Sequence, residues 1–352
     1  MDTPCLCAPV VNSWTIFGPM QCLSHRVLGL GLIALFFAAC QPETAPTAKP
    51  EPALPALPPV PLFNGDSAYA YVAKQVSFGP RVPGTAEHRA CGDWLVEKLQ
   101  AFSDTVIEQH AKVTIYNGQQ VPMRNIIASW HPEKKERILL FAHWDTRPMA
   151  DQDPERKNEP IDGANDGGSG VGVLLEIARH LALQAPQVGV DIFLTDVEDM
   201  GEPHGAMGLG QESLKTWCLG TQYWVKNPHV PNYTARFGIL LDMVGSKDAK
   251  FAREGYSMRY AAGVVNKVWK AAAAAGHGDR FLSETRNYVG VDDHVFVNEA
   301  GIPSIDIIAY DATTGGFPAT WHTHADNMDN IDKESLQAVG ATVAHVVWTE
   351  RE

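Results

Sequence analysis

The chain has 352 residues, 45% of them hydrophobic and 20% charged, and its formal net charge is −13 at pH 7. These globular values exclude a largely disordered chain, and the length suits one large domain or two ordinary ones. The negative charge and the absence of a Lys/Arg cluster argue against a nucleic-acid partner, because binding to phosphates needs a basic surface.

The N-terminal residues are typical of an export signal. Residues 26–40 (RVLGLGLIALFFAAC) contain one basic residue, an apolar run too short to cross a bilayer, and small residues before a cysteine. This ending resembles the lipobox of bacterial lipoproteins, in which Cys40 would be lipidated; an ordinary secretory signal cut near Ala39 is the alternative. We expect a leader over residues 1–40 and a protein anchored only by its lipid, facing the periplasm. Gln41 favours the outer membrane over the inner one, because it stands where some inner-membrane lipoproteins carry a retention aspartate.

A proline-rich segment follows the leader. Residues 41–62 contain eight of the 24 prolines, so we expect a semi-rigid tether without helix or sheet. One globular domain is then expected over residues 63–352. Only Cys91 and Cys218 lie in this domain, and they could form a disulfide or remain two buried thiols.

Helical and strand patterns alternate along the domain. Helices are predicted over residues 66–76, 86–102, 167–184, 211–226, 260–276 and 334–349, and strands over 112–116, 125–130, 138–144, 190–196, 237–245 and 302–310. This alternation predicts an α/β fold, a three-layer αβα sandwich with a central mixed, mostly parallel sheet.

Acidic residues and histidines follow the predicted strands. They are His143, Asp145, Asp166, Asp196, Glu198, Asp199, Asp242, Asp292, Asp293, His294 and His322. Ligand sites of α/β sheets gather at the carboxyl ends of strands, so we expect these groups to converge. Converging carboxylates would repel one another without a counter-charge, and zinc accepts such oxygen and nitrogen ligands while keeping one position open for chemistry. The sequence therefore predicts a catalytic metal site.

Two other kinds of site are disfavoured. The chain has no G-x-S-x-G motif, and neither Cys91 nor Cys218 is expected near a plausible base, which argues against a nucleophilic mechanism. The glycine-rich residues 167–170 could bind phosphate at a helix start, but the surrounding acidic residues make an anion site unfavourable.

Six separated motifs carry a family resemblance. HWDTRP, GANDGGSGVGVLLEIAR, LTDVED, LLDMVG, VDDHVF and WHTHADNMDNID resemble, in this order, the metal-binding loops of the M28-type zinc aminopeptidase superfamily. They are most similar to bacterial glutaminyl cyclases (glutaminyl-peptide cyclotransferases), as is FGPRVPGTAEHRACGDWL at residues 78–95. The resemblance covers nearly the whole domain. It implies a zinc-dependent acyltransferase that converts the N-terminal glutamine of peptides or proteins into pyroglutamate and releases ammonia.

The resemblance also implies a metal-ligand set. Asp166, Asp199 and His322 would hold one zinc ion. Asp199 departs from the family, because many members have the longer glutamate there. Asp306 stands where the animal enzymes commonly have histidine, and its role is open.

Further roles are implied around the metal. Glu198 would be the general acid and base, and Asp242 and Asp292 would form a short hydrogen-bonded pair beside it. Trp321 and Phe317 would line the pocket for the substrate's first side chain. The role of Asp293 is open: it could replace Asp292 or orient His143. The loop residues Asp326, Asn327 and Asn330 are expected to hydrogen-bond the backbone of their own loop.

Two alternative functions stay open at this point. The first is a two-zinc aminopeptidase of the same superfamily, with Glu198 activating water and five residues as ligands: His143, Asp166, Asp199, Asp242 and His322. The second is an inactive binding module on the same fold. The cyclase is favoured by the tryptophan before His322, the DNMDNID sequence after it and the HWDTRP form of the first motif.

Overall fold

The computed structural model describes residues 56–203, 214–286 and 289–352. The leader with Cys40, most of the proline-rich segment and residues 211–213 of one predicted helix lie outside this description. The helices are α1 (Gly65–Val76), α2 (Ala86–Phe102), α3 (Gly168–Leu183), α5 (Leu219–Lys226), α6 (Gly255–Ala274), α7 (Asp293–Glu299) and α8 (Lys333–Thr349). The strands are β1 (Thr105–Thr114), β2 (Gln120–Trp130), β3 (Arg137–His143), β4 (Gly189–Thr195), β5 (Phe237–Asp242), β6 (Phe251–Glu254), β7 (Phe281–Arg286) and β8 (Ser304–Ile308).

Six strands form the central sheet, in the order β1-β2-β4-β3-β5-β8. The β1–β2 and β2–β4 pairs are antiparallel, whereas β4–β3, β3–β5 and β5–β8 are parallel. The predicted mixed, mostly parallel sheet is thus confirmed. Strands β3 and β4 are buried at every residue, as their continuous apolar runs predict. Strands β6 and β7 form a separate two-stranded parallel sheet.

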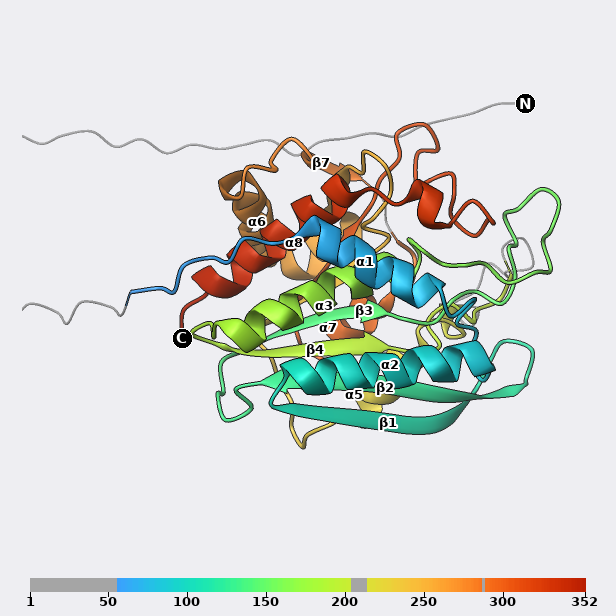
Figure 1. Cartoon of the computed structure of the whole chain (residues 1–352), viewed down its shortest axis with the longest axis horizontal. Helices are drawn as coiled ribbons and strands as arrows, with labels where there is room; N and C mark the ends of the chain where they lie inside the picture. Colours follow the sequence, from blue (N-terminus) through green and yellow to red (C-terminus); the bar gives the residue numbers. More distant parts are fainter. Residues whose placement is uncertain (1–55, 204–213, 287–288) are drawn as a thin grey trace, which may run out of the picture. The chain divides into compact units, whose positions relative to one another are not determined.

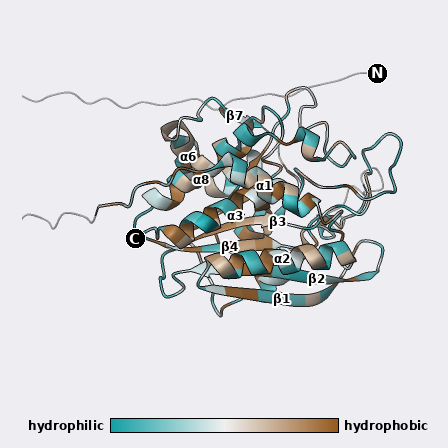
Figure 2. Ribbon diagram, in the orientation of Figure 1, coloured by the Kyte–Doolittle hydropathy of each residue, from teal (hydrophilic) through white to brown (hydrophobic). Residues whose placement is uncertain are grey.

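The sheet lies between two layers of helices. Along β3, Ile138 and Leu140 pack into the core cluster that contains side chains of α1, α2, α3 and α8, whereas Leu139 and Phe141 pack against α5 and α7. Side chains of a strand alternate between the two faces of a sheet, so each face receives its own apolar set. Figure 1 shows α1, α2, α3 and α8 in front of the sheet, and Figure 2 shows hydrophobic residues along β3 and β4 beneath them. This is the predicted three-layer αβα sandwich.

The glycine-rich start of α3 serves close packing. A Cβ atom on Gly170 would lie 2.1 Å from the carbonyl oxygen of Leu241 at the end of β5. Gly167 has a φ of +87° and lies equally close to the loop after β3, where a Cβ atom would meet the Asp145 carbonyl oxygen at 2.5 Å. Only glycine fits at these positions, and the close approach places the N-terminal end of α3 beside the carboxyl ends of β3 and β5.

Some elements differ from the sequence-based expectation. Strand β1 begins at Thr105 rather than residue 112, because an edge strand that alternates exposed and half-buried residues lacks an apolar run. Helix α7 and strands β6 and β7 were not predicted: α7 has seven residues, β6 has four, and β7 is exposed along most of its length. Cys91 and Cys218 are buried free thiols, which resolves the question of a disulfide between them. Among the residues that the structure describes, no helix is long and apolar enough to cross a bilayer.

Candidate active site

The predicted site residues converge on one cavity of about 240 Å³ at the carboxyl ends of the central strands. The residues among its lining that the sequence indicated are Asp166, Glu198, Asp199, Asp242, Asp292, Phe317, Trp321 and His322. They come from loops that follow β3, β4 and β5 and from the segments before α7 and α8. The parallel direction of these strands brings their ends together, as expected.

Three of these side chains offer a metal site. Asp166, Asp199 and His322 are buried, and one donor atom from each lies within 4.8 Å of the others. His322 Nε2 is 3.3 Å from Asp199 Oδ1 and 3.7 Å from Asp166 Oδ2. Asp199 Oδ2 is buried without a hydrogen-bond partner. Two buried carboxylates and an imidazole, with one carboxylate oxygen left unpaired, fit a zinc ion that keeps one position open.

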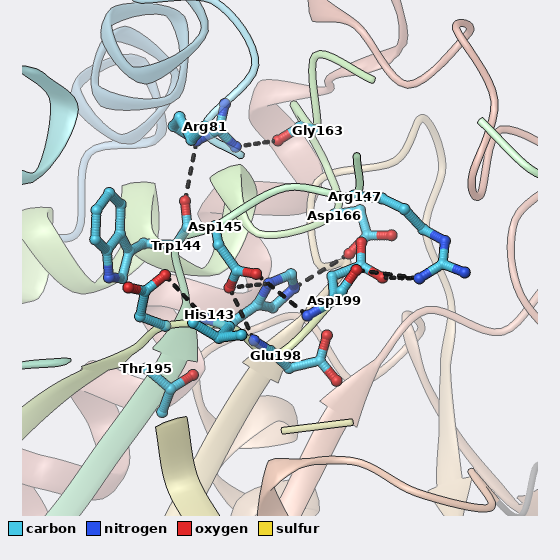
Figure 3. A network of polar contacts seen from close by, with 12 residues as sticks. Arg81, His143, Trp144, Asp145, Arg147, Gly163, Asp166, Thr195, Glu198 and Asp199 are labelled. Carbon is cyan, nitrogen blue, oxygen red and sulfur yellow. Dashed lines mark hydrogen bonds and ion pairs between the residues drawn. The ribbon is translucent and has the colours of Figure 1, made fainter. Parts of the chain in front are cut away.

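Two further residues orient this group. Asp151 Oδ1 lies 2.9 Å from His322 Nδ1, which leaves Nε2 of the ring directed at the carboxylates. Arg147 donates to Asp199 Oδ1 at 3.2 Å and to the Asp199 backbone oxygen at 3.0 Å (Figure 3). Arg147 also forms an ion pair with Asp151. Burial opposes ionisation of Asp151, but hydrogen bonds from His322 and Arg147 outweigh it and lower the pKa of that carboxyl.

The loop that contains His322 is tied to the loop that contains Asp166. The Asp326 carboxylate accepts hydrogen bonds from the backbone amides of Asn165 at 2.7 Å and Asp166 at 3.0 Å. The expectation that Asp326 bonds its own loop was wrong, because its side chain points inward and is buried. Asn327 and Asn330 do donate to carbonyl oxygens of their own loop, at 3.0 and 2.8 Å.

Arg81 holds the loops around the site from the side of α1 and α2. Its guanidinium is fully buried and donates to the backbone oxygens of Trp144 at 3.0 Å and Gly163 at 2.6 Å (Figure 3). It also donates to the backbone oxygen of Asp162 at 2.7 Å. The sequence motif FGPR gave no direct indication of this role. It could have been noticed only as an arginine in an otherwise apolar turn.

Glu198 lies at the end of β4 beside the metal-binding group. Its backbone amide and that of Asp199 donate to the two oxygens of Asp145, at 3.1 and 3.2 Å (Figure 3). Burial raises the pKa of Glu198 well above its usual range; His143 opposes this, whereas Asp199 and other nearby carboxylates add to it. A carboxyl with a raised pKa is suited to both accepting and donating a proton.

Cys218 donates a hydrogen bond to that carboxylate. Its Sγ lies 3.2 Å from Glu198 Oε1. The expectation that Cys218 lies far from any plausible base was therefore wrong, because backbone hydrogen bonds join two segments that are 20 residues apart. Burial raises the pKa of the Cys218 thiol well above its usual range, and the Glu198 charge adds to this, so both effects favour the protonated thiol over the thiolate.

Asp242 and Asp292 line the same cavity as Glu198. A carboxylate oxygen of Asp292 lies within 4.8 Å of a carboxylate oxygen of Glu198. Asp292 Oδ1 accepts a hydrogen bond from the amide of Asp293 at 2.6 Å. Asp242 Oδ1 is 3.4 Å from His143 Nε2. Their pairing with each other stays a prediction.

Asp293 and Asp306, whose roles the sequence left open, have surroundings that differ from those of Asp242. Asp293 accepts from Thr195 Oγ1 at 2.5 Å and is not part of the cavity lining. Asp306 is buried beside Asp292 and His294.

A second metal-binding group adjoins the first. His143, Asp166 and Asp242 also have donor atoms within 4.8 Å of one another, and His143 Nε2 is 3.1 Å from Asp166 Oδ1. Asp166 belongs to both groups. This geometry provides the residues that the two-zinc alternative requires, so the positions of the side chains do not by themselves decide the number of ions.

Aromatic rings form the wall opposite the carboxylates. The ring centroids of Phe317 and Trp321 are 4.8 Å apart, and Trp321 stacks on His322 at 3.8 Å. Trp217, which was not predicted from the sequence, also lines the cavity and stacks on His322 at 6.3 Å. Met243 lines the cavity too, although the motif LLDMVG that contains it indicated only Asp242, and no motif contains Trp217.

Several residues next to the reacting groups have strained backbone. Val197, Cys218, Met243 and His322 have φ values of 55°, 53°, 47° and 55°. The left-handed region is unfavourable for residues other than glycine, above all for a β-branched one such as Val197. Strain of this kind gathers at functional sites, where the surrounding structure enforces it.

Comparisons with known proteins agree with this geometry. The model of peptidase family M28 matches residues 125–347. A curated relative, aminopeptidase YwaD of Bacillus subtilis (strain 168), is 29% identical over 231 residues, which are 64% of this chain and 44% of that protein. The chain thus spans less than half the length of that relative.

Two solved structures are more similar. The glutaminyl cyclase of Bacteroides thetaiotaomicron, bound to N-acetylhistamine, has 53% sequence identity and a TM-score of 0.81, covering 83% of this chain and all of that one. The glutaminyl cyclase of Tannerella forsythia has 50% identity and a TM-score of 0.79, covering 83% of this chain and all of that one.

Proposed function

The chain belongs to peptidase family M28, and from this premise we propose that it is a glutaminyl-peptide cyclotransferase. It converts the N-terminal glutamine of peptides or proteins into pyroglutamate and releases ammonia. The observation that carries this proposal is the cavity, whose lining combines the carboxylate of Glu198, a metal-binding group and aromatic rings. The similarity to two solved glutaminyl cyclases supports it.

Asp166, Asp199 and His322 would hold one zinc ion. When bound, zinc supplies Lewis-acid polarisation of the side-chain carbonyl of the substrate's glutamine. Asp151 and Arg147 keep the imidazole and one carboxylate of this group in place. Outer partners of this kind usually matter for metal affinity almost as much as the ligands themselves.

Glu198 would move the proton. It takes a proton from the substrate's α-amine, whose nitrogen attacks the side-chain carbonyl carbon and forms the bond that closes a five-membered ring. The bond from this carbon to the amide nitrogen then breaks. Glu198 returns its proton to that nitrogen, which leaves as ammonia. Asp292 lies beside Glu198, and its negative charge favours the protonated form of Glu198 during the transfer.

Trp321 and Phe317 would enclose the glutamine side chain. Their rings form one side of the cavity, and Trp217 extends the same wall near His322. Because ring closure is intramolecular, water is a competing reactant rather than a required one. An aromatic wall that keeps water out therefore favours cyclisation over hydrolysis.

The aminopeptidase alternative uses the same carboxylate with a water molecule. A direct test incubates the purified protein with a Gln-initiated peptide and, separately, with a Leu-initiated peptide of otherwise identical sequence. Loss of the mass of ammonia from the first peptide, without shortening of the second, is the expected result. Release of free leucine would contradict the cyclase, and no change in either peptide would favour an inactive binding module.

The chain's placement in the cell is part of the proposal. We infer a leader over residues 1–40, a tether over 41–62 and a catalytic domain over 63–352, with lipidation at Cys40 and the domain in the periplasm. The sequence RVLGLGLIALFFAAC supports this. Metabolic labelling with a palmitate analogue, with Cys40→Ala as the control, tests it: label in the parent chain but not in the variant is expected.

A further inference from the structure

We propose that Cys218 is a positioning residue, whose S–H group donates a hydrogen bond to Oε1 of Glu198 and holds that carboxylate in its working orientation. The kinetic part of this inference rests on the proposed function, because it takes Glu198 as the group that moves the proton. The hydrogen bond itself does not depend on the reaction.

The contact is built from both side chains and backbone. Sγ of Cys218 lies 3.2 Å from Glu198 Oε1, and the amide of Cys218 donates to the Glu198 carbonyl oxygen at 3.0 Å. The amide of Leu219 donates in the same way to Val197, also at 3.0 Å. These bonds hold the segment before α5 against the end of β4, so the thiol cannot move away from the carboxylate.

The Cys218 thiol restrains the Glu198 side chain through this hydrogen bond. Among the described ranges 56–203, 214–286 and 289–352, no other side chain or amide donates a hydrogen bond to this carboxylate. A glutamate side chain has three rotatable bonds and loses considerable rotamer freedom when it is fixed. Removal of the thiol would therefore let the carboxylate rotate away from the substrate's amine.

A thiol suits this position because it is a weak, neutral donor. Cys218 is fully buried, and burial keeps its thiol protonated, so that it remains a donor. A charged donor such as lysine would form an ion pair and oppose proton uptake by Glu198. The weak S–H bond orients Oε1 and leaves the carboxylate basic.

Two substitutions separate positioning from packing. Cys218→Ala removes the donor, and Cys218→Ser replaces it with a hydroxyl of similar size. Neither is β-branched, which matters because Cys218 has a φ of 53°. The matched control is Cys91→Ala, which truncates the other buried thiol, in helix α2.

The expected kinetics follow from the loss of one hydrogen bond. Cys218→Ala should lower kcat about fivefold with little change in KM, the size expected for one neutral hydrogen bond. Cys218→Ser should restore most of kcat, and Cys91→Ala should keep the parent value. If the Cys218 thiol only fills space, kcat should be higher in Cys218→Ala than in Cys218→Ser, because a buried alanine is tolerated better than a buried hydroxyl. Equal kcat values in all three variants, or serine below alanine, would overturn the proposal.

An infrared measurement tests the hydrogen bond without any turnover. Subtracting the spectrum of Cys218→Ala from that of the parent isolates the S–H stretching band of Cys218, and Cys91→Ala isolates that of Cys91. The Cys218 band is expected at the lower frequency, and it should rise in Glu198→Gln, where a neutral amide replaces the carboxylate. The hydrogen bond would be refuted if the two bands had the same frequency and the Cys218 band did not shift in Glu198→Gln.

The kinetic and infrared experiments together distinguish failure of this inference from failure of the proposed function. Kinetics are read on whichever peptide the parent chain turns over, since Glu198 would also serve the aminopeptidase reaction. If no peptide reacts, the proposed function fails and the infrared result alone decides whether Cys218 restrains Glu198.

Discussion

The side chain of Asp326 accepts a hydrogen bond from the backbone amide of Asp166 across 160 residues of sequence, at 3.0 Å. The same side chain accepts a second hydrogen bond from the amide of Asn165, and the two bonds join the loop that carries His322 to the loop that carries Asp166. Two of the three proposed zinc ligands therefore owe their relative position to one buried carboxylate.

Replacing this carboxylate should weaken metal binding. In Asp326→Asn one acceptor oxygen becomes an NH₂ group, which faces a backbone N–H and cannot accept from it. We expect zinc affinity to fall about tenfold, as is usual for partners of metal ligands. Competition with a chelating dye measures this. Asp329→Asn, an exposed change in the same loop, is the control and should match the parent.

Glu198→Gln should separate catalysis from metal binding. The amide keeps the shape of the side chain but cannot accept and return a proton, so kcat should fall by at least about 100-fold. The zinc content by elemental analysis should stay that of the parent, because Glu198 is not among the three proposed ligands. Substantial turnover by this variant would show that another group moves the proton.

The proposed single ion makes a stoichiometric prediction. Native mass spectrometry should find one zinc per chain, and His322→Ala should lose it, because that ring supplies the nitrogen ligand. His143→Ala should retain it, since His143 belongs only to the second group of donors. Two zinc ions in the parent chain, one of which disappears in His143→Ala, would favour the aminopeptidase arrangement instead.

Arg81 should contribute to stability rather than to chemistry. Arg81→Ala leaves three backbone carbonyl oxygens without their donor, and the free energy of unfolding should fall by about 3 kcal/mol, near 1 kcal/mol for each lost bond. Urea denaturation measures this. Arg89→Ala, on the exposed side of α2, removes a single surface bond and should cost well under half as much.

Aromatic stacking beside the metal group gives a prediction about substrate binding. Trp321 stacks on His322 and lines the cavity, so Trp321→Ala should open the pocket to water and raise KM for a Gln-initiated peptide about tenfold, the loss expected for one buried aromatic contact. Steady-state kinetics test this, with zinc content as the check that His322 still binds. An unchanged KM would exclude Trp321 from the substrate wall.

The elements that were predicted well have a simple pattern. Strands β3 and β4 are continuous apolar runs, and α2 has apolar residues at helical spacing with Thr85 as its cap, so local sequence is enough to identify them. Strand β1 lies at the edge of the sheet and alternates exposed and half-buried residues, so it contains no apolar run. Its first half is therefore indistinguishable from a polar loop until β2 pairs with it.

The chemistry was visible in the sequence because metal ligands and proton carriers must be particular residue types. Aspartate, glutamate and histidine at the ends of parallel strands marked the cavity, since backbone direction alone brings those ends together. The supporting contacts were not visible. Arg81 bonds backbone oxygens, Asp326 bonds backbone amides and Cys218 bonds one carboxylate oxygen, and any polar residue in a loop could do the same.

The order of apolar runs and acidic motifs along the chain determined by itself the αβα architecture and the group of residues around the cavity, because periodic burial and ligand chemistry are properties of residue types. Tertiary structure alone decided which carboxylate faces which amide, that Cys218 lies against Glu198, and that Asp166 stands between two sets of donor atoms. These contacts depend on side-chain direction and on loops that meet across 20 to 160 residues of sequence, and such contacts leave no periodic signal in a sequence.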